Sequence, residues 1–179
     1  MQPPLFQVRI EKAFEALGES SIIYILLKIM AKMSLPNLDM TRLHRLLEEI
    51  KEAKAIIESI LRRTRDGFLA DVEARYATRY AIVKIVEGAA VAGSYILETR
   101  FDVIPESYVE VFDALSKKGV ISYQVGEGFR RLVGLRNLVV HKYWDVDDGR
   151  IYDEAESNGL EVVEKFMREI EEYVERENR

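Results

Sequence analysis

Apolar residues recur at steps of three and four positions along most of the chain, a spacing that places them on one face of an α-helix. Only four prolines interrupt this pattern, so it predicts an all-α protein. The expected helices cover residues 9–35, with a break at Gly18, then 41–63, 68–99, 106–118, 122–143 and 159–175, and a short helix begins within 149–158.

Residues with capping chemistry mark the expected helix ends. Asp39 or Thr41 can cap the first main helix, and Asp66 can cap the long helix that follows it. Pro105 suits a first helical position, and Gly119 favours the end of the helix that Pro105 begins.

The helix over 68–99 carries a largely small-residue face, which permits close approach of neighbouring helices. That face consists of Ala77, Tyr80, Ala81, Ile85, Ala89, Ala92 and Ile96. Glu87 lies within the same stretch, either as a buried polar anchor at an interface or as an exposed residue. The helix over 122–143 contains three glycines, which indicate tight packing or a bend.

Pro36 and Asn37 separate the front of the chain from the rest. We therefore expect an N-terminal helical extension over residues 1–38 and one main domain over 39–179. The extension is either an appended packing or dimerisation element or an independently functioning arm.

Composition excludes several kinds of chemistry. The chain has no cysteine, so it has no disulfide, thiolate metal site or cysteine nucleophile. Its two histidines, His44 and His141, are far apart, which argues against a multi-histidine metal site, and we expect no metal and no cofactor. The longest apolar run, 22–27, ends at Lys28, so we expect no membrane span and a cytoplasmic protein.

Charge is distributed unevenly. Residues 117–143 contain six basic residues and one acid, whereas residues 145–179 contain thirteen acids and five bases. The basic stretch can bind a phosphate backbone, or it can be a solvated helix face that the acidic tail balances.

Residues 134–145 hold the densest group of polar candidates. On a helix, Asn137 and His141 are four positions apart and share a face, and Arg136 and Tyr143 are seven apart and nearly eclipse. His141 lies about 140° around the axis from Arg136, so we expect a symmetry-related copy to complete a site in a groove between helices.

These residue types suit metal-independent cleavage of RNA. His141 can take the proton from a ribose 2′-hydroxyl, and Arg136 can stabilise charge on the phosphate. Asn137 can orient the imidazole, and Tyr143 can bind phosphate or stack on a base. Further candidates for RNA contact are Arg130, Arg131, Lys142 and Trp144, the last of which can instead be a packing residue.

Other polar residues are weaker candidates. We interpret His44 as an exposed or interhelical residue. The acids Asp145, Asp147 and Asp148 resemble a metal cluster only in their spacing, and helix capping explains them better. The glycines of 126–128 lack the remaining residues of a phosphate-binding loop.

The sequence from Arg136 through His141 to Tyr143 resembles the R-x4-H-x-Y motif of the HepT branch of HEPN-domain proteins. The likeness extends to 105–115, to 119–121 and to the start of the long helix at 68–71. It covers about residues 41–174 and leaves the first forty outside.

The resemblance implies an antiparallel helical bundle that forms a homodimer with two motifs in a shared cleft. It implies a metal-independent endoribonuclease toxin whose antitoxin is an MNT-type minimal nucleotidyltransferase that transfers AMP to Tyr143. One alternative is a non-catalytic HEPN subunit that binds such a nucleotidyltransferase. A third interpretation is a helical dimerisation protein whose motif only packs.

Overall fold

The computed structural model describes residues 38–177. The chain divides into two compact units, Met1–Pro36 and Asn37–Arg179, and the described residues belong to the second. The helix expected over 9–35 lies outside them. Within the described part every regular element is helical, which confirms the all-α prediction.

The elements follow one another with short connections. In chain order they are α3 (Met40–Ile60), α4 (Arg65–Ala70), α5 (Val72–Phe101), α6 (Tyr108–Lys117), α7 (Tyr123–His141), the 3-10 turn η1 (Tyr143–Asp145), α8 (Asp148–Glu154), the π-helical turn η2 (Ala155–Gly159) and α9 (Glu161–Glu177).

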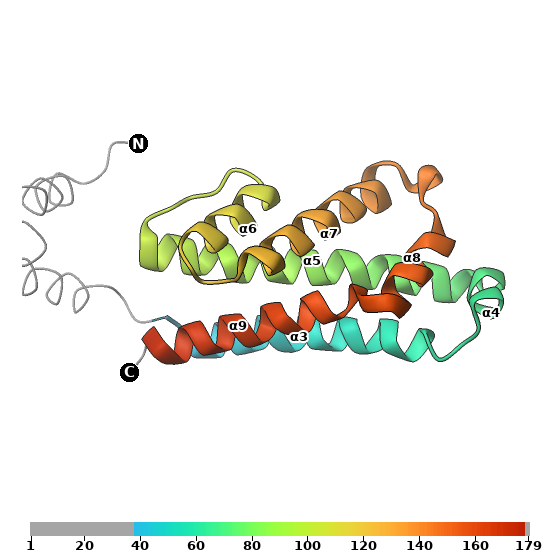
Figure 1. Cartoon of the computed structure of the whole chain (residues 1–179), viewed down its shortest axis with the longest axis horizontal. Coiled ribbons are helices and arrows are strands. Elements are labelled where there is room, and N and C mark those ends of the chain that lie inside the picture. Colours follow the sequence, from blue (N-terminus) through green and yellow to red (C-terminus); the bar gives the residue numbers. More distant parts are fainter. Residues whose placement is uncertain (1–37, 178–179) are drawn as a thin grey trace, which may run out of the picture. The chain divides into compact units, whose positions relative to one another are not determined.

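Helix α5 lies between two layers of the bundle. Figure 1 shows α3 and α9 along one side of α5 and α6 and α7 along the other, with the chain reversing direction from α3 to α5 and from α5 to α7. Helix α5 contacts α3, α6 and α7, and α9 contacts α3 and α7. This antiparallel arrangement places the carboxyl end of α7 beside the amino-terminal half of α5 (Figure 1).

Small side chains let the neighbouring helices approach α5. Ala89 and Ala92 are fully buried, and a Cβ on Gly93 would lie 2.6 Å from Val111 of α6. By length and composition α5 could cross a membrane, but 61% of its most apolar window is buried, as in the core helix of a bundle. Tyr80 departs from the expected inner face and is 65% exposed, because the neighbouring helices leave its side of α5 uncovered.

Three aromatic rings pack against one another where α6, α7 and α9 meet. The ring of Phe129 lies 4.6 Å from that of Phe112 and 4.6 Å from that of Phe166, centroid to centroid. All three side chains are fully buried. This packing fixes α7, which carries the motif, against its neighbours.

Two helix starts differ from the expected ones. Asp66 does not cap the long helix, because the chain first forms the short helix α4, capped by Thr64, and then begins α5 after Asp71. Pro105 does not begin α6, because the Ser107 side chain accepts a hydrogen bond from the Glu110 amide and caps the helix there.

Two other helix boundaries agree with the sequence pattern. Of the two possible caps of α3, Asp39 is the one used, and its carboxylate accepts from the Arg42 amide at 3.1 Å. Gly119 follows α6 with a φ of 69°, the left-handed conformation that glycine adopts without strain.

The end of α7 is the most consequential difference from the expected helices. The helix stops at His141, because Lys142 leaves the helical conformation with φ −136° and ψ 46°. Tyr143 therefore lies in η1 and not one further turn along α7. The expected eclipse of Tyr143 with Arg136 does not occur.

Candidate functional site

Arg136 of α7 is directed at α5. Its Nη2 and Nε donate to Oε1 of Glu87 at 2.6 and 3.1 Å, and its Nη1 donates to the Asn137 side-chain oxygen at 3.2 Å. Only 17% of the Arg136 side chain is exposed. The guanidinium is therefore held in one orientation by its own chain.

Glu87 joins three helices in this cluster. The Tyr108 hydroxyl of α6 donates to its second carboxylate oxygen, and the Tyr108 ring lies 5.3 Å from the Arg136 guanidinium carbon. Glu87 is thus a half-buried anchor that holds Arg136 of the motif. This agrees in part with the first of its two expected roles, that of a buried polar anchor. The sequence signal for Glu87 is a lone acid within an apolar stretch, and Tyr108 lies in the segment 105–115 of the family resemblance without being singled out there.

The electrostatics keep Glu87 ionised. Burial alone raises the pKa of Glu87, but the hydrogen bonds from Tyr108 and Arg136 and the Arg136 charge outweigh it, so the pKa is lowered. The same hydrogen bond, followed by burial, raises the pKa of Tyr108, which keeps its hydroxyl a donor.

Neutralising this anchor gives a pH-dependent loss of stability. We expect Glu87→Gln to lower the free energy of unfolding by about 1 kcal/mol at pH 7, a value reduced for partial solvent exposure. Since the folded-state pKa is lowered, the stabilisation is present above about pH 4.3, the ordinary value, and disappears as pH falls through the folded-state value. Thermal unfolding of both proteins across pH 3–7 measures this, and a gap that stays constant would contradict it.

His141 and Asn137 share an exposed side of α7. Both residues are exposed, and their four-residue spacing within α7 places them on one side of the helix. Among residues 38–177, the His141 imidazole has no hydrogen-bond partner, and the Asn137 side-chain oxygen accepts from Arg136 instead of contacting the imidazole. The imidazole is therefore open to a ligand.

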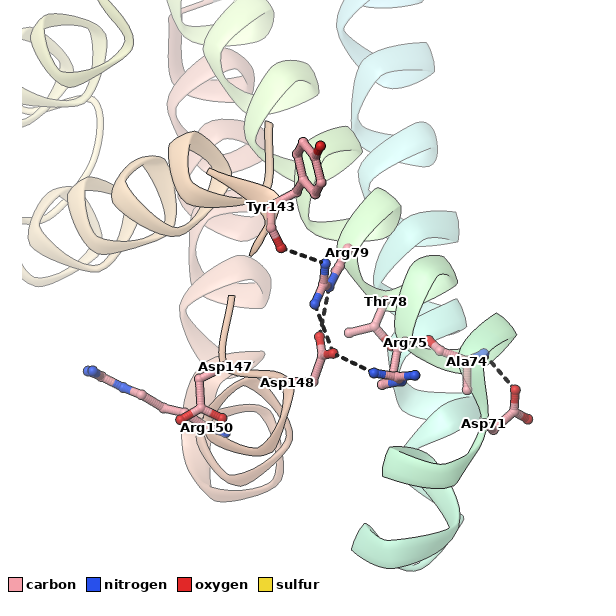
Figure 2. Close-up of polar contacts among 9 residues, drawn as sticks. All are labelled: Asp71, Ala74, Arg75, Thr78, Arg79, Tyr143, Asp147, Asp148 and Arg150. Carbon is pink, nitrogen blue, oxygen red and sulfur yellow. Dashed lines mark hydrogen bonds and ion pairs between the residues drawn. The ribbon is translucent and has the colours of Figure 1, made fainter. Parts of the chain in front are cut away.

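Tyr143 and Trp144 project from η1 into solvent. They are 62% and 67% exposed, and their rings pack edge to face with centroids 5.1 Å apart. The Tyr143 carbonyl accepts from Nη1 of Arg79 at 3.2 Å, while its ring points away from that contact (Figure 2). The phenol hydroxyl is thus accessible from outside.

Two of the remaining basic candidates, Arg130 and Arg131, have different surroundings. Arg130 is paired with Asp113 and, at 3.2 Å, with Glu127. Arg131 lines a groove of about 760 Å³ between α7 and the segment from η1 to the start of α9. Neither Arg136 nor His141 lines that groove.

The three acids after the motif have separate structural roles. Asp147 caps α8 by accepting from the Arg150 amide at 3.0 Å, as expected. Asp148 is buried and paired with Arg79 and Arg75. Asp145 lies in the exposed η1 turn, and within residues 38–177 no cluster of three or more acids or histidines could hold a metal ion.

Residues 38–177 thus form an all-helical antiparallel bundle in which Arg136 and His141, five positions apart, lie near the end of α7. The family model described as Ribonuclease HepT-like matches residues 50–170. The chain belongs to this HepT-like family.

Solved structures share the fold at low sequence identity. The cytosolic protein YutE of Bacillus subtilis, of unknown function, aligns with TM-score 0.67 and 19% identity over 78% of this chain and 93% of its own. A tri-AMPylated HEPN toxin of Shewanella oneidensis in complex with MNT antitoxin aligns with TM-score 0.67 and 20% identity, over 75% of this chain and 99% of its own. A toxin–antitoxin structure with AMP-PNP aligns with TM-score 0.66 and 18% identity, over 74% of this chain and 99% of its own. The comparison with curated proteins found no matching sequence.

Proposed function

We propose that this protein is a metal-independent endoribonuclease toxin that an MNT-type nucleotidyltransferase antitoxin restrains. The observation that carries the proposal is that the last two turns of α7 hold both an anchored Arg136 and an exposed His141, whose imidazole has no partner within residues 38–177. Membership of the HepT-like ribonuclease family supports the reaction class.

The reaction needs only groups that the chain supplies. His141 takes the proton of the ribose 2′-hydroxyl, and the 2′-oxygen attacks the adjacent phosphorus. A bond forms between the 2′-oxygen and phosphorus, the bond from phosphorus to the 5′-oxygen breaks, and the 5′-oxygen leaves as a hydroxyl with a proton from water. Arg136 keeps two N–H groups beyond its three bonds to Glu87 and Asn137, and these donate to the phosphate as its charge grows.

The working unit in this proposal is a homodimer. Two apolar side chains remain exposed near the Glu87–Arg136 pair. Val91 lies one turn after Glu87 on α5, and Val140 lies one turn after Arg136 on α7. A second copy that covers them places two His141 imidazoles and two Arg136 groups along one cleft. Tyr143, Trp144 and Lys142 lie at its edge, where they can contact RNA.

Introducing a charge at Val140 tests the dimer. We expect Val140→Lys to halve the mass measured by light scattering, because a buried unpaired ammonium opposes association. The control Ile104→Lys alters another exposed apolar residue, which precedes α6, and should leave the mass unchanged. A Val140→Lys protein of unchanged mass would contradict this interface.

The proposed control of the toxin acts on Tyr143. The tyrosine oxygen attacks the α-phosphorus of ATP, a new oxygen–phosphorus bond forms, and pyrophosphate leaves. The exposed hydroxyl of Tyr143 supports this proposal, as do the AMPylated toxin and its MNT antitoxin among the similar structures. The attached phosphate adds negative charge at the cleft and repels the phosphates of RNA.

A second candidate function is a non-catalytic subunit that binds the nucleotidyltransferase. The commitment of three Arg136 donors to Glu87 and Asn137 favours it, because fewer remain for phosphate. Incubating the unmodified protein with mixed RNA in excess chelator separates the two, with intact mass recorded on the same sample. New RNA ends carrying a 2′,3′-cyclic phosphate support the nuclease, and intact RNA supports the binding subunit.

Two wider expectations complete the proposal. The chain works in the cytoplasm, where both RNA and ATP are present. Residues 1–38 form an extension separate from the HEPN domain over 39–179.

A further inference from the structure

The η1 turn, which carries Tyr143, has few interactions of its own that fix its position. None of its residues is buried, and no side chain caps it. Its local backbone bonds join the Lys142 amide to the Leu138 carbonyl at 2.9 Å and the Asp145 amide to the Lys142 carbonyl at 2.8 Å. These bonds join the turn to the end of α7 but do not reach α5 or α8.

Arg79 of α5 makes that attachment. Its Nη1 donates to the Tyr143 carbonyl, from 64 residues away in the chain. Its Nε and Nη2 donate to the two oxygens of Asp148 at 2.8 and 2.9 Å. Figure 2 shows the guanidinium between the turn and the first turn of α8, so one planar group ties α5, η1 and α8 together.

The Arg79 guanidinium is itself held firmly. Its side chain is only 15% exposed, and Asp148 is 7% exposed, so solvent screens their pairing weakly. The centroid of the Tyr76 ring also lies 5.7 Å from the guanidinium carbon of Arg79. A cation fixed in this way gives the Tyr143 carbonyl a defined position.

We propose that Arg79 is a positioning residue that sets the place of Tyr143 and, two residues earlier, of His141. The inference rests on the proposed function for its effect on activity. The fork of Arg79 is essential to it, because separate N–H groups of one rigid plane reach the carboxylate and the carbonyl at once. A lysine keeps the charge but lacks this geometry.

The chain offers a matched control at Arg75. This arginine lies one turn earlier on α5 and also pairs with Asp148, at 3.4 Å, but the structure gives it no contact with η1. Arg75→Lys and Arg79→Lys make the same substitution beside the same buried carboxylate, to which Arg75 has one contact at 3.4 Å and Arg79 has two bonds at 2.8 and 2.9 Å. Only the second removes the bond to the turn.

Hydrogen exchange and cleavage kinetics of the full chain test the inference. In Arg79→Lys we expect the Lys142 and Asp145 amides to exchange about tenfold faster or more, through local opening, with Arg75→Lys within about twofold of wild type. We also expect kcat for RNA cleavage to fall by about 10- to 100-fold in Arg79→Lys, with KM nearly unchanged. A merely structural role would lower the thermal midpoint of both variants without a selective fall of kcat and a selective rise of exchange in Arg79→Lys.

The outcomes separate this inference from the proposed function. If Arg79→Lys exchanges like Arg75→Lys, or exchanges faster but keeps the wild-type kcat, the positioning role is wrong. If the wild type itself cleaves no RNA, the proposed function fails, and the exchange comparison alone decides whether Arg79 holds the turn.

Discussion

RNA cleavage is expected to fall by at least about 100-fold when His141 is replaced by alanine. The physical reason is that His141 is the only imidazole on α7, and an imidazole is the side chain that most often acts as a general base. Without the imidazole, the 2′-hydroxyl must lose its proton to water. The measurement is the initial rate of cleavage in chelator, with the new ends identified.

The other histidine provides the control. His44 is also exposed, but it lies on α3, away from the motif helix. We expect His44→Ala to cleave like wild type and both variants to keep the wild-type mass in solution. Undiminished cleavage by His141→Ala would overturn the assignment of the base. Equal losses in the two variants would point to a defect in folding.

Loss of AMP transfer is the second large effect that we expect, in Tyr143→Phe. Phenylalanine keeps the ring and its packing against Trp144 but has no oxygen to attack ATP. Incubation with the nucleotidyltransferase, Mg²⁺ and ATP should add adenylyl groups to wild type and none to this variant. Intact mass and peptide mapping measure the result.

Tyr123→Phe is the matched control for this experiment. Tyr123 begins the same helix and is 74% exposed, so it is at least as accessible as Tyr143. We expect it to be unmodified in wild type and its substitution to change nothing. Modification of Tyr143→Phe, or its loss in Tyr123→Phe, would assign the modified tyrosine to another position.

The anchoring of Arg136 bears on both experiments. Glu87 and Tyr108 hold the guanidinium against α5, so its remaining donors face a fixed direction. Such a fixed cation loses little freedom when a phosphate binds. The same geometry suits a binding subunit, and the chelator assay decides between the two functions.

The sequence by itself determined the helical class, most helix positions and the placement of Asn137 and His141 on one helix face. These features are local, because helix periodicity and capping depend on residues within a few positions of each other. Where a local rule had a close competitor it failed, as when Asp71 and not Asp66 capped α5.

Only the tertiary structure decided what surrounds the motif. Glu87 lies 49 residues from Arg136 and Arg79 lies 64 from Tyr143, so their contacts depend on how α5 and α7 pack and in which register. The exposure of Tyr80 has the same origin, since the helix pattern fixes its angle but not which neighbours cover it. Spacing along one helix cannot specify such contacts, because they form between elements that the chain brings together only on folding.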